Sequence, residues 1–326
     1  MSKIHSPNVE QIKKELIGEV GTYLDQLSAA QSDVADHYRT PDTRHAAVDL
    51  MAPPLKDGVT VEDVAALLAK DNATLTAELE KSKAAAVKNS AAAKDVLNAQ
   101  AAHRLEGLQA VAGRALPAAP AALQLQLLNK PFLIWANPPS SLEESEIVPS
   151  NSWAKGRMRS DHRHVIVGFQ ISFYYLWTNP RDTYLLADVH AYLTFNGYAF
   201  VTADSGFFPN EQRYAKARVT GSLFILEWWN QPPTSPPGQA SQQITAANLS
   251  VDTSGWDNPG AIGGGRIFRG YDLSYTQLIA PPGGTVVFRV LVNVFIETGT
   301  GGSAEVDFAS GDFQVGSPAI LVQILS

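Results

Sequence analysis

The chain has 326 residues, a formal net charge of −7, 45% hydrophobic residues and no cysteine. The lack of cysteine excludes disulfides, thiolate metal sites and cysteine nucleophiles, and the negative charge argues against nucleic acid as a partner, because phosphate binding relies on clustered lysine and arginine. The hydrophobic content is sufficient for buried cores, and the length predicts two domains.

Aromatic residues divide the chain in two. Every Trp and Phe follows residue 130, and only Tyr23 and Tyr38 precede it. Alanine and leucine favour helices, whereas aromatic and β-branched residues favour strands. The composition therefore predicts a helical oligomerisation or stalk domain over residues 1–120, an extended linker over 121–160 and an aromatic-rich β-sandwich over 161–326.

The first 120 residues show helical periodicity. Apolar residues recur at spacings of three and four from Val9 to Leu27, which predicts an amphipathic helix to about Ala35. Thr60 begins a second run without proline until Pro117, long enough for one helix of more than 50 residues or for a helical hairpin broken near Asn89.

The apolar stripe of the second run needs a partner, because a helix is stabilised mainly by burying its apolar face. The partner is expected to be the N-terminal helix or another copy of the chain. The predicted fold class is therefore α+β multidomain, with long Ala-rich helices in a bundle or coiled-coil-like arrangement before a C-terminal antiparallel β-sandwich or jelly roll.

After Pro131 the sequence is typical of an antiparallel β domain. Leu123, Leu125 and Leu127 alternate with glutamine, which already indicates an extended segment, and Asn196-Gly197 is typical of a hairpin turn. The long segment Gln231–Gly265, with Gly263–Gly265 at its end, is expected to be a loop. Strands are predicted at Val165–Trp177, Tyr184–Phe195, Tyr198–Ala203, Arg213–Trp229, Thr285–Thr298, Ala304–Phe308 and Ala319–Leu325.

Three histidines suggest a metal site. His162 and His164 are two residues apart at the start of a strand, a spacing that directs both imidazoles to one face, and His190 lies on the next strand. This resembles the metal-binding pair of cupin-type barrels, but Val165 to Gly168 stand where such sites carry a glutamate. Hydrogen-bonded or surface histidines are the alternative.

Aromatic residues near polar ones are the second candidate site. Sugar-binding surfaces and protein interfaces both use exposed aromatic faces beside Asn, Asp or Arg, while packing at the ends of the sandwich is the structural alternative. The candidate ligand-binding residues are Trp153, Arg157, Phe207, Phe208, Trp228, Trp229, Trp256 and Asp257.

No catalytic motif is present, so the leading prediction is a non-enzymatic, oligomeric structural or binding protein without a cofactor. The helices would join copies of the chain, and the sandwich would bind a subunit, a receptor or a cell-surface glycan. One alternative is a membrane-active toxin, because the order of helices and sandwich is similar to that of three-domain crystal toxins. A carbohydrate-active or metal-dependent enzyme on the sandwich is the third reading.

The N-terminal residues lack the apolar core of a conventional signal peptide. Synthesis as a soluble cytoplasmic protein is therefore expected, which leaves later release or incorporation into a particle open. A membrane partner is expected only for a toxin.

Overall fold

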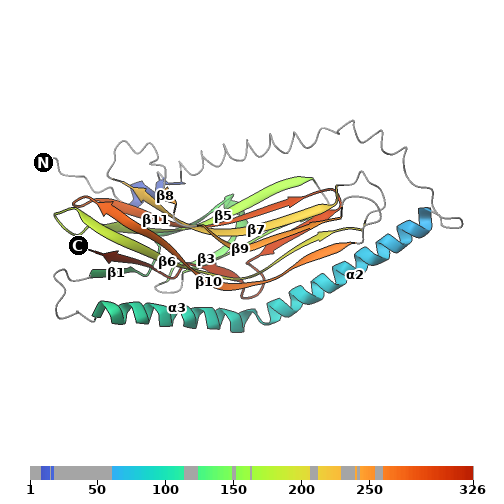
Figure 1. The fold of residues 1–326 in the computed structure, drawn as a ribbon, viewed down its shortest axis with the longest axis horizontal. Helices are drawn as coiled ribbons and strands as arrows, with labels where there is room; N and C mark the ends of the chain where they lie inside the picture. The colour runs from blue at the N-terminus through green and yellow to red at the C-terminus, as the bar shows by residue number, and fades with distance from the viewer. Residues whose placement is uncertain are drawn as a thin grey trace, which may run out of the picture.

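Two antiparallel sheets form the body of the molecule in a computed structural model (Figure 1). The model describes residues 9–14, 16–17, 61–113, 124–148, 152–161, 164–205, 212–228, 239–240, 243–253 and 260–325. We call the eight-stranded sheet A and the six-stranded one sheet B. Sheet A holds β1 (Gln124–Leu128), β3 (Leu142–Glu146), β4 (Trp153–Asp161), β6 (Leu185–Ala203), β10 (Ala261–Ala280), β12 (Gly302–Asp307), β13 (Gln314–Gly316) and β14 (Ile320–Ile324). Sheet B holds β2 (Leu133–Asn137), β5 (Val165–Thr178), β7 (Tyr214–Glu227), β8 (Gln239–Ala240), β9 (Ile244–Asp252) and β11 (Thr285–Thr298).

The core lies between the two sheets and follows from a two-residue period in the long strands. On β11 every second side chain from Val286 to Ile296 is fully buried, and β5 contributes Phe169, Phe173 and Trp177 to the same cluster. The residues between them point to the outer face of sheet B. The prediction of an antiparallel sandwich is confirmed, and so are the bounds of β11.

The expected hairpin at Asn196-Gly197 is wrong, because β6 runs without a turn from Leu185 to Ala203. Leu193 and Phe195 before the pair, and Ala199 after it, stay on the core side. Glycine is required here because a Cβ on Gly197 would lie 2.7 Å from the Asp307 carbonyl oxygen and would overlap the ring of Phe308. The pair therefore serves close packing inside a strand.

The expected loop at Gly263–Gly265 is also wrong, since these residues begin β10 and pair with β6 opposite Val201, Phe200 and Ala199. Gly264 has a φ of +149°, and a Cβ there would contact the backbone of Ala199 and Phe200. Part of the same segment forms β8 and β9.

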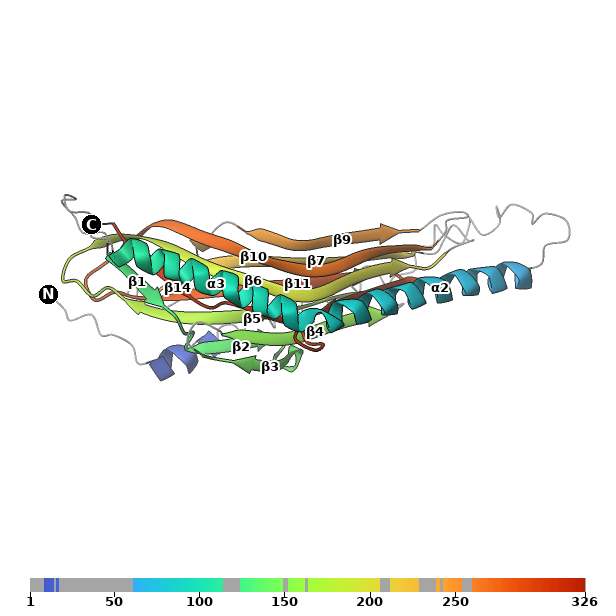
Figure 2. The same cartoon turned by 90° about the horizontal axis from the view of Figure 1, so that it is seen from below.

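The two long helices do not form a bundle, which corrects the predicted fold class. α2 (Val61–Lys88) and α3 (Ser90–Gly113) follow one another across the outer face of sheet A, and α2 continues past the end of the strands (Figures 1 and 2). The break falls at Asn89, as the hairpin alternative predicted, but the helices do not fold back on each other. The partner of the apolar stripe is the chain's own sheet.

Apolar contacts hold α2 on sheet A. Leu79, with Ala86 and Val87 beside it, packs on Tyr198, Phe200 and Phe313, and all three rings are at most 3% exposed. This face of β6 is therefore buried as well as its core face. Oligomerisation was predicted because an apolar helical stripe needs a partner. Sheet A of the same chain is that partner.

A buried charge cluster lies beside these rings. Lys83 of α2 forms ion pairs with Glu305 and with Asp307, the latter at 3.0 Å, and both acidic side chains are at most 3% exposed. Burial alone would raise the pKa of Asp307, but hydrogen bonds from the Ser310 hydroxyl, from the amides of Ala309 and Ser310 and from Lys83 outweigh burial and lower the pKa. Burial likewise disfavours the charged form of Lys83, but its two carboxylate partners raise the pKa. Lys83 and Asp307 are therefore both charged at neutral pH.

Polar contacts fix the junction of the two helices. Asn196 Nδ2 donates to the carbonyl oxygens of Ser90 at 3.0 Å and Asp312 at 2.9 Å, and the Arg266 guanidinium donates to the Asn89 carbonyl at 3.1 Å. The Ser90 hydroxyl accepts the amide proton of Asp312 at 3.0 Å. The break between α2 and α3 is thus anchored to sheet A by hydrogen bonds.

The range 121–160, expected as an extended linker, contains β1 to β4, which pair with strands of both sheets. Of the first predicted helix, residues 9–14 and 16–17 are helical, and the rest lies outside the described residues. Ile12 and Leu16 of this segment are buried against sheet B beside Tyr174, Trp228 and Val287. Among the described residues, no helix combines the length and apolar character needed to cross a membrane.

Candidate functional site

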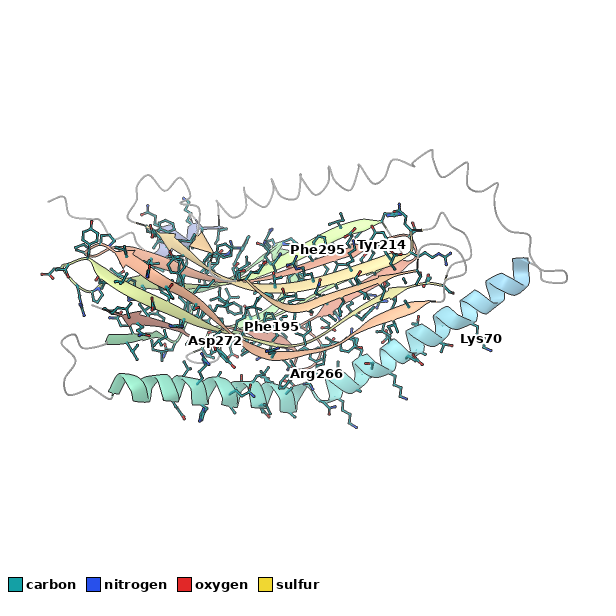
Figure 3. All side chains as sticks on the ribbon, in the orientation of Figure 1. Lys70, Phe195, Tyr214, Arg266, Asp272 and Phe295 are labelled. Carbon is teal, nitrogen blue, oxygen red and sulfur yellow. The ribbon has the colours of Figure 1, made fainter. Side chains whose placement is uncertain are left out.

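A groove of about 390 Å³ lies on the outer face of sheet B, over β7, β9 and β11. This volume falls in the range of small-ligand sites. Figure 3 shows one of its residues, Phe295, on the side of the sandwich turned away from α2 and α3. The groove is lined by Lys216, Ala217, Arg218, Thr220, Gln243, Asn248, Leu249, Ser250, Asn293 and Phe295.

Strand register sets the central row of the groove. Arg218 of β7 pairs with Phe295 of β11 on one side and with Asn248 of β9 on the other. Directly opposed residues of antiparallel strands point to the same face, so these three side chains stand side by side, roughly 5 Å apart from strand to strand. Opposite Phe295 on β5 lies Gly168, which leaves that flank of the row without a side chain.

The neighbouring rows are polar. On one side Asn293 is opposed by Thr220, whose hydroxyl is 3.4 Å from Gln243 Nε2. On the other side Lys216 is opposed by Glu297 and forms an ion pair with it at 3.2 Å. Lys216 also stands over the ring of Tyr214, with its Nζ 5.2 Å from the ring centroid.

The side chains of Arg218 and Asn248 in the central row, and of Asn293 in the next row, have no protein partner among the described residues. Arg218 and Asn248 are exposed, and Asn293 is partly exposed. None of the three side chains makes a hydrogen bond or ion pair within the described part of the chain. A partly buried ring, a guanidinium and two amides therefore present unused donors, acceptors and an apolar face in one groove.

Among the described residues, the carboxylates lie outside the lining of the groove. Glu297, the one carboxylate that the described residues place directly beside the groove, is already paired with Lys216. The described residues contain no group of three His, Asp or Glu side chains placed to hold a metal ion. The carboxylate with a lowered pKa, Asp307, belongs to the contact between α2 and sheet A.

Two of the three predicted metal-binding histidines, His164 and His190, lie far apart. His164 lies just before β5 and three residues after Asp161, the last residue of β4. Asp161 is opposite Ser303 of β12, and Ser303 is opposite Thr202 of β6. His164 is therefore near the Thr202 end of β6. His190 lies on β6 opposite Leu321, twelve residues before Thr202 and therefore roughly 40 Å along the strand. His162 lies outside the described residues.

Trp153 and Arg157, both predicted to bind ligand, lie on β4. Trp153 is 7% exposed, donates from Nε1 to Glu146 at 3.0 Å and has the Nζ atoms of Lys94 and Lys155 within 5.7 Å of its ring centroid. Arg157 is exposed, with its Nε 3.5 Å from Glu143. Trp153 is therefore buried beside Lys94 of α3 and its own strand neighbours, and neither it nor Arg157 lines the groove.

Trp228 lies at the end of β7 and is 8% exposed, in the cluster that includes Ile12 and Leu16. The remaining predicted residues lie outside the described part of the chain: Phe207, Phe208, Trp229, Trp256 and Asp257. A ligand-binding role for those five stays a prediction.

The groove residues were not predicted as a site. The alternation of Arg218, Thr220 and Ser222 with Val219 and Leu223 already indicated that β7 has a polar face. To locate the site, one also needs the strand register that places Arg218 opposite Asn248 and Phe295. That register is not visible in the linear sequence.

Comparisons with known proteins give no family. No protein-family model and no curated protein matches the sequence. One of the similar solved structures is a carbohydrate-binding module in complex with β-1,4-galactotriose, with 12% identity, a TM-score of 0.18 and coverage of 61% of this chain and 88% of that one. Another is a module with specific mannan recognition, with 6% identity, a TM-score of 0.21 and coverage of 63% and 98%. An aminopeptidase from a marine sediment Thaumarchaeota archaeon has 10% identity, a TM-score of 0.21 and coverage of 62% and 37%. TM-scores this low do not establish a shared fold.

Proposed function

We propose that this chain is a non-enzymatic recognition protein whose groove on sheet B binds a glycan. The central row carries the proposal, because Phe295 offers an apolar ring face beside the unpartnered side chains of Arg218 and Asn248. Sugars present apolar ring faces bordered by hydroxyl groups. An aromatic ring flanked by amides and a guanidinium meets both features.

A sheet face suits a glycan better than an extended peptide. Peptides that add to a sheet use free backbone groups at an edge strand. The backbone of β7 is paired on both sides, with β11 and with β9, so β7 offers a ligand in the groove only its side chains. The side chains of Phe295, Asn248 and Asn293 have few rotatable bonds, which limits the conformational entropy that they lose when a ligand binds.

Replacing Phe295 or Asn248 by alanine is expected to weaken glycan binding without unfolding the protein. Phe295→Ala removes the stacking surface and should lower the affinity about tenfold, since an aromatic contact contributes about 0.5–1.5 kcal/mol beyond its buried area. Asn248→Ala removes one amide and should lower it about threefold to tenfold. Affinity electrophoresis against a panel of polysaccharides, followed by calorimetry on the one bound, measures both effects.

The matched control is Phe268→Ala, which removes a phenylalanine that is 39% exposed on the outer face of sheet A. Its glycan affinity should equal that of the unaltered protein. Equal loss in the Phe268 and Phe295 variants, or binding that survives both groove substitutions, contradicts a glycan site in this groove.

A further inference from the structure

We infer that the glycan bound in the sheet B groove carries a carboxylate, as in a polysaccharide of uronic acids, and that Arg218 binds this group. The inference rests on the proposed function and specifies the ligand of the same groove. It starts from the charge of the groove. The chain as a whole has a net charge of −7, whereas the groove lining contains two cations and no acidic residue.

The two cations differ in what they already bind. Lys216 is paired with Glu297 at 3.2 Å, so its charge is balanced within the protein. The guanidinium of Arg218 has no hydrogen bond or ion pair within the described residues. Apart from Glu297, the nearest carboxylate along this face is Asp252, two rows beyond Arg218 and therefore roughly 13 Å along β9. Arg218 thus supplies the surplus positive charge of the groove.

A guanidinium selects a planar anion. Its donors form a fixed fork that matches the two oxygens of a carboxylate, and such bidentate pairs are both strong and directional. A phosphate bound by protein is usually held by several cations or by backbone amides at a helix N-terminus. The groove offers a single unpaired guanidinium on a sheet, which favours a carboxylate.

The neighbours of Arg218 define what surrounds that carboxylate. Phe295 lies on one side of Arg218 and Asn248 on the other, so an anion on the guanidinium has a ring face and an amide within one strand spacing, roughly 5 Å. The carboxylate is therefore expected on a ring that also presents an apolar face and hydroxyl groups. A uronic acid unit of a polysaccharide has all three.

The test compares acidic polysaccharides with their own carboxyl-reduced forms. Pectate, alginate and hyaluronan are each used before and after reduction of the carboxylates to alcohols, which removes the charge and leaves the sugar backbone unchanged. Affinity electrophoresis identifies the chain that is bound, and calorimetry on oligosaccharides of that chain gives the dissociation constants. We expect at least one acidic form to bind, and its reduced form to bind at least about tenfold more weakly.

Arg218→Gln should lower the affinity for the acidic form to that for the reduced form, and should leave the weaker binding of the reduced form unchanged. Arg218→Lys keeps the charge but loses the fork, so its affinity should fall between the two. Arg269→Gln, an exposed arginine on β10 of the other sheet, is the control and should bind as the unaltered protein does. Thermal unfolding of each variant verifies that it is folded.

The outcomes separate the inference from the proposed function. Equal binding of the acidic and reduced forms, or full binding by Arg218→Gln, overturns the carboxylate assignment and leaves glycan binding in place. Binding of none of these chains and of no neutral polysaccharide overturns both. Binding of polyglutamate that survives Phe295→Ala also overturns the inference, because a ligand carboxylate would then be recognised without a sugar ring.

Discussion

Lys83→Met is expected to destabilise the folded protein by about 3 kcal/mol, the lower end of the range for removing one member of a buried ion pair. The substitution leaves Glu305 and Asp307 buried without their shared cation. Arg159, whose Nη1 is 3.7 Å from Glu305, compensates part of the lost charge, which places the effect at this lower end. Chemical unfolding followed by circular dichroism measures the difference.

Two controls connect this loss to the charge cluster. Lys81→Met removes an exposed lysine two positions away on the same helix and should change the stability by less than about 0.5 kcal/mol. Adding Asp307→Asn to Lys83→Met should recover part of the stability, because it removes one uncompensated carboxylate. If Lys81→Met and Lys83→Met have the same effect, the cluster does not hold α2 on the sheet.

The cost of Lys83→Met should also shrink in acid. The folded-state pKa of Asp307 lies below its ordinary value of 3.8, so its stabilisation is complete above the unfolded-state pKa and is lost as the pH falls through the folded-state pKa. The unaltered protein therefore loses this stabilisation at low pH, whereas the variant lacks the part that Lys83 contributes and keeps the part from the hydrogen bonds of Ser310 and Ala309, so it has less to lose. The difference between the two should be smaller at about pH 3 than at about pH 7.

Trp228→Ala is expected to destabilise the protein by about 3–5 kcal/mol through the cavity it leaves. Trp228 is 8% exposed and packs with Tyr174, Val287 and the helical residues Ile12 and Leu16. Its indole nitrogen has no hydrogen-bond partner among the described residues, so the cost comes from lost packing. Denaturant unfolding gives the free energy.

Trp228→Phe is the matched control and should cost much less, because it keeps most of the apolar volume. Glycan affinity of the folded fraction should stay unchanged in both variants, since Trp228 lies ten residues and roughly 33 Å along β7 from Arg218. A stable Trp228→Ala variant that no longer binds glycan would instead support the prediction, made from sequence, that Trp228 contacts the ligand.

The long strands could be predicted where only one of their faces is buried in the core. On the core side of β5 and β11 every second residue is buried without a break, from Phe169 to Trp177 and from Val286 to Ile296, and the sequence located both strands to within a residue. On β6 the period is lost after Thr194, because Tyr198 and Phe200 are buried under α2 while Ala199 and Val201 are buried in the core. A strand buried on both faces has no alternation to detect.

The helices were predicted in position but not in packing. Their residues follow from the sequence, which left open whether they form one continuous helix or break near Asn89. An apolar stripe says that a partner exists, but not whether the partner is a helix or a sheet. The partner is sheet A, and its contribution comes from Tyr198, Phe200 and Phe313, which the sequence analysis assigned to a separate domain.

The candidate site could not be predicted because no linear motif encodes it. Arg218, Asn248 and Phe295 meet only through the registers of β7 with β9 and β11. Tryptophans are the more visible aromatic signal in the sequence, but Trp153 and Trp228 are both buried. Phe295 is one of several apolar side chains on the outer face of β11, with Val287 and Leu291, and was the weaker signal in the sequence.

Hydroxyl-radical footprinting of Phe295, with and without the polysaccharide that the protein binds, tests the central claim most directly. The proposed groove predicts that bound glycan slows oxidation of Phe295, while oxidation of Tyr184, which is 70% exposed, and of Phe268 on sheet A is unchanged. Unchanged oxidation of Phe295 with protection elsewhere would contradict a glycan site on the outer face of sheet B.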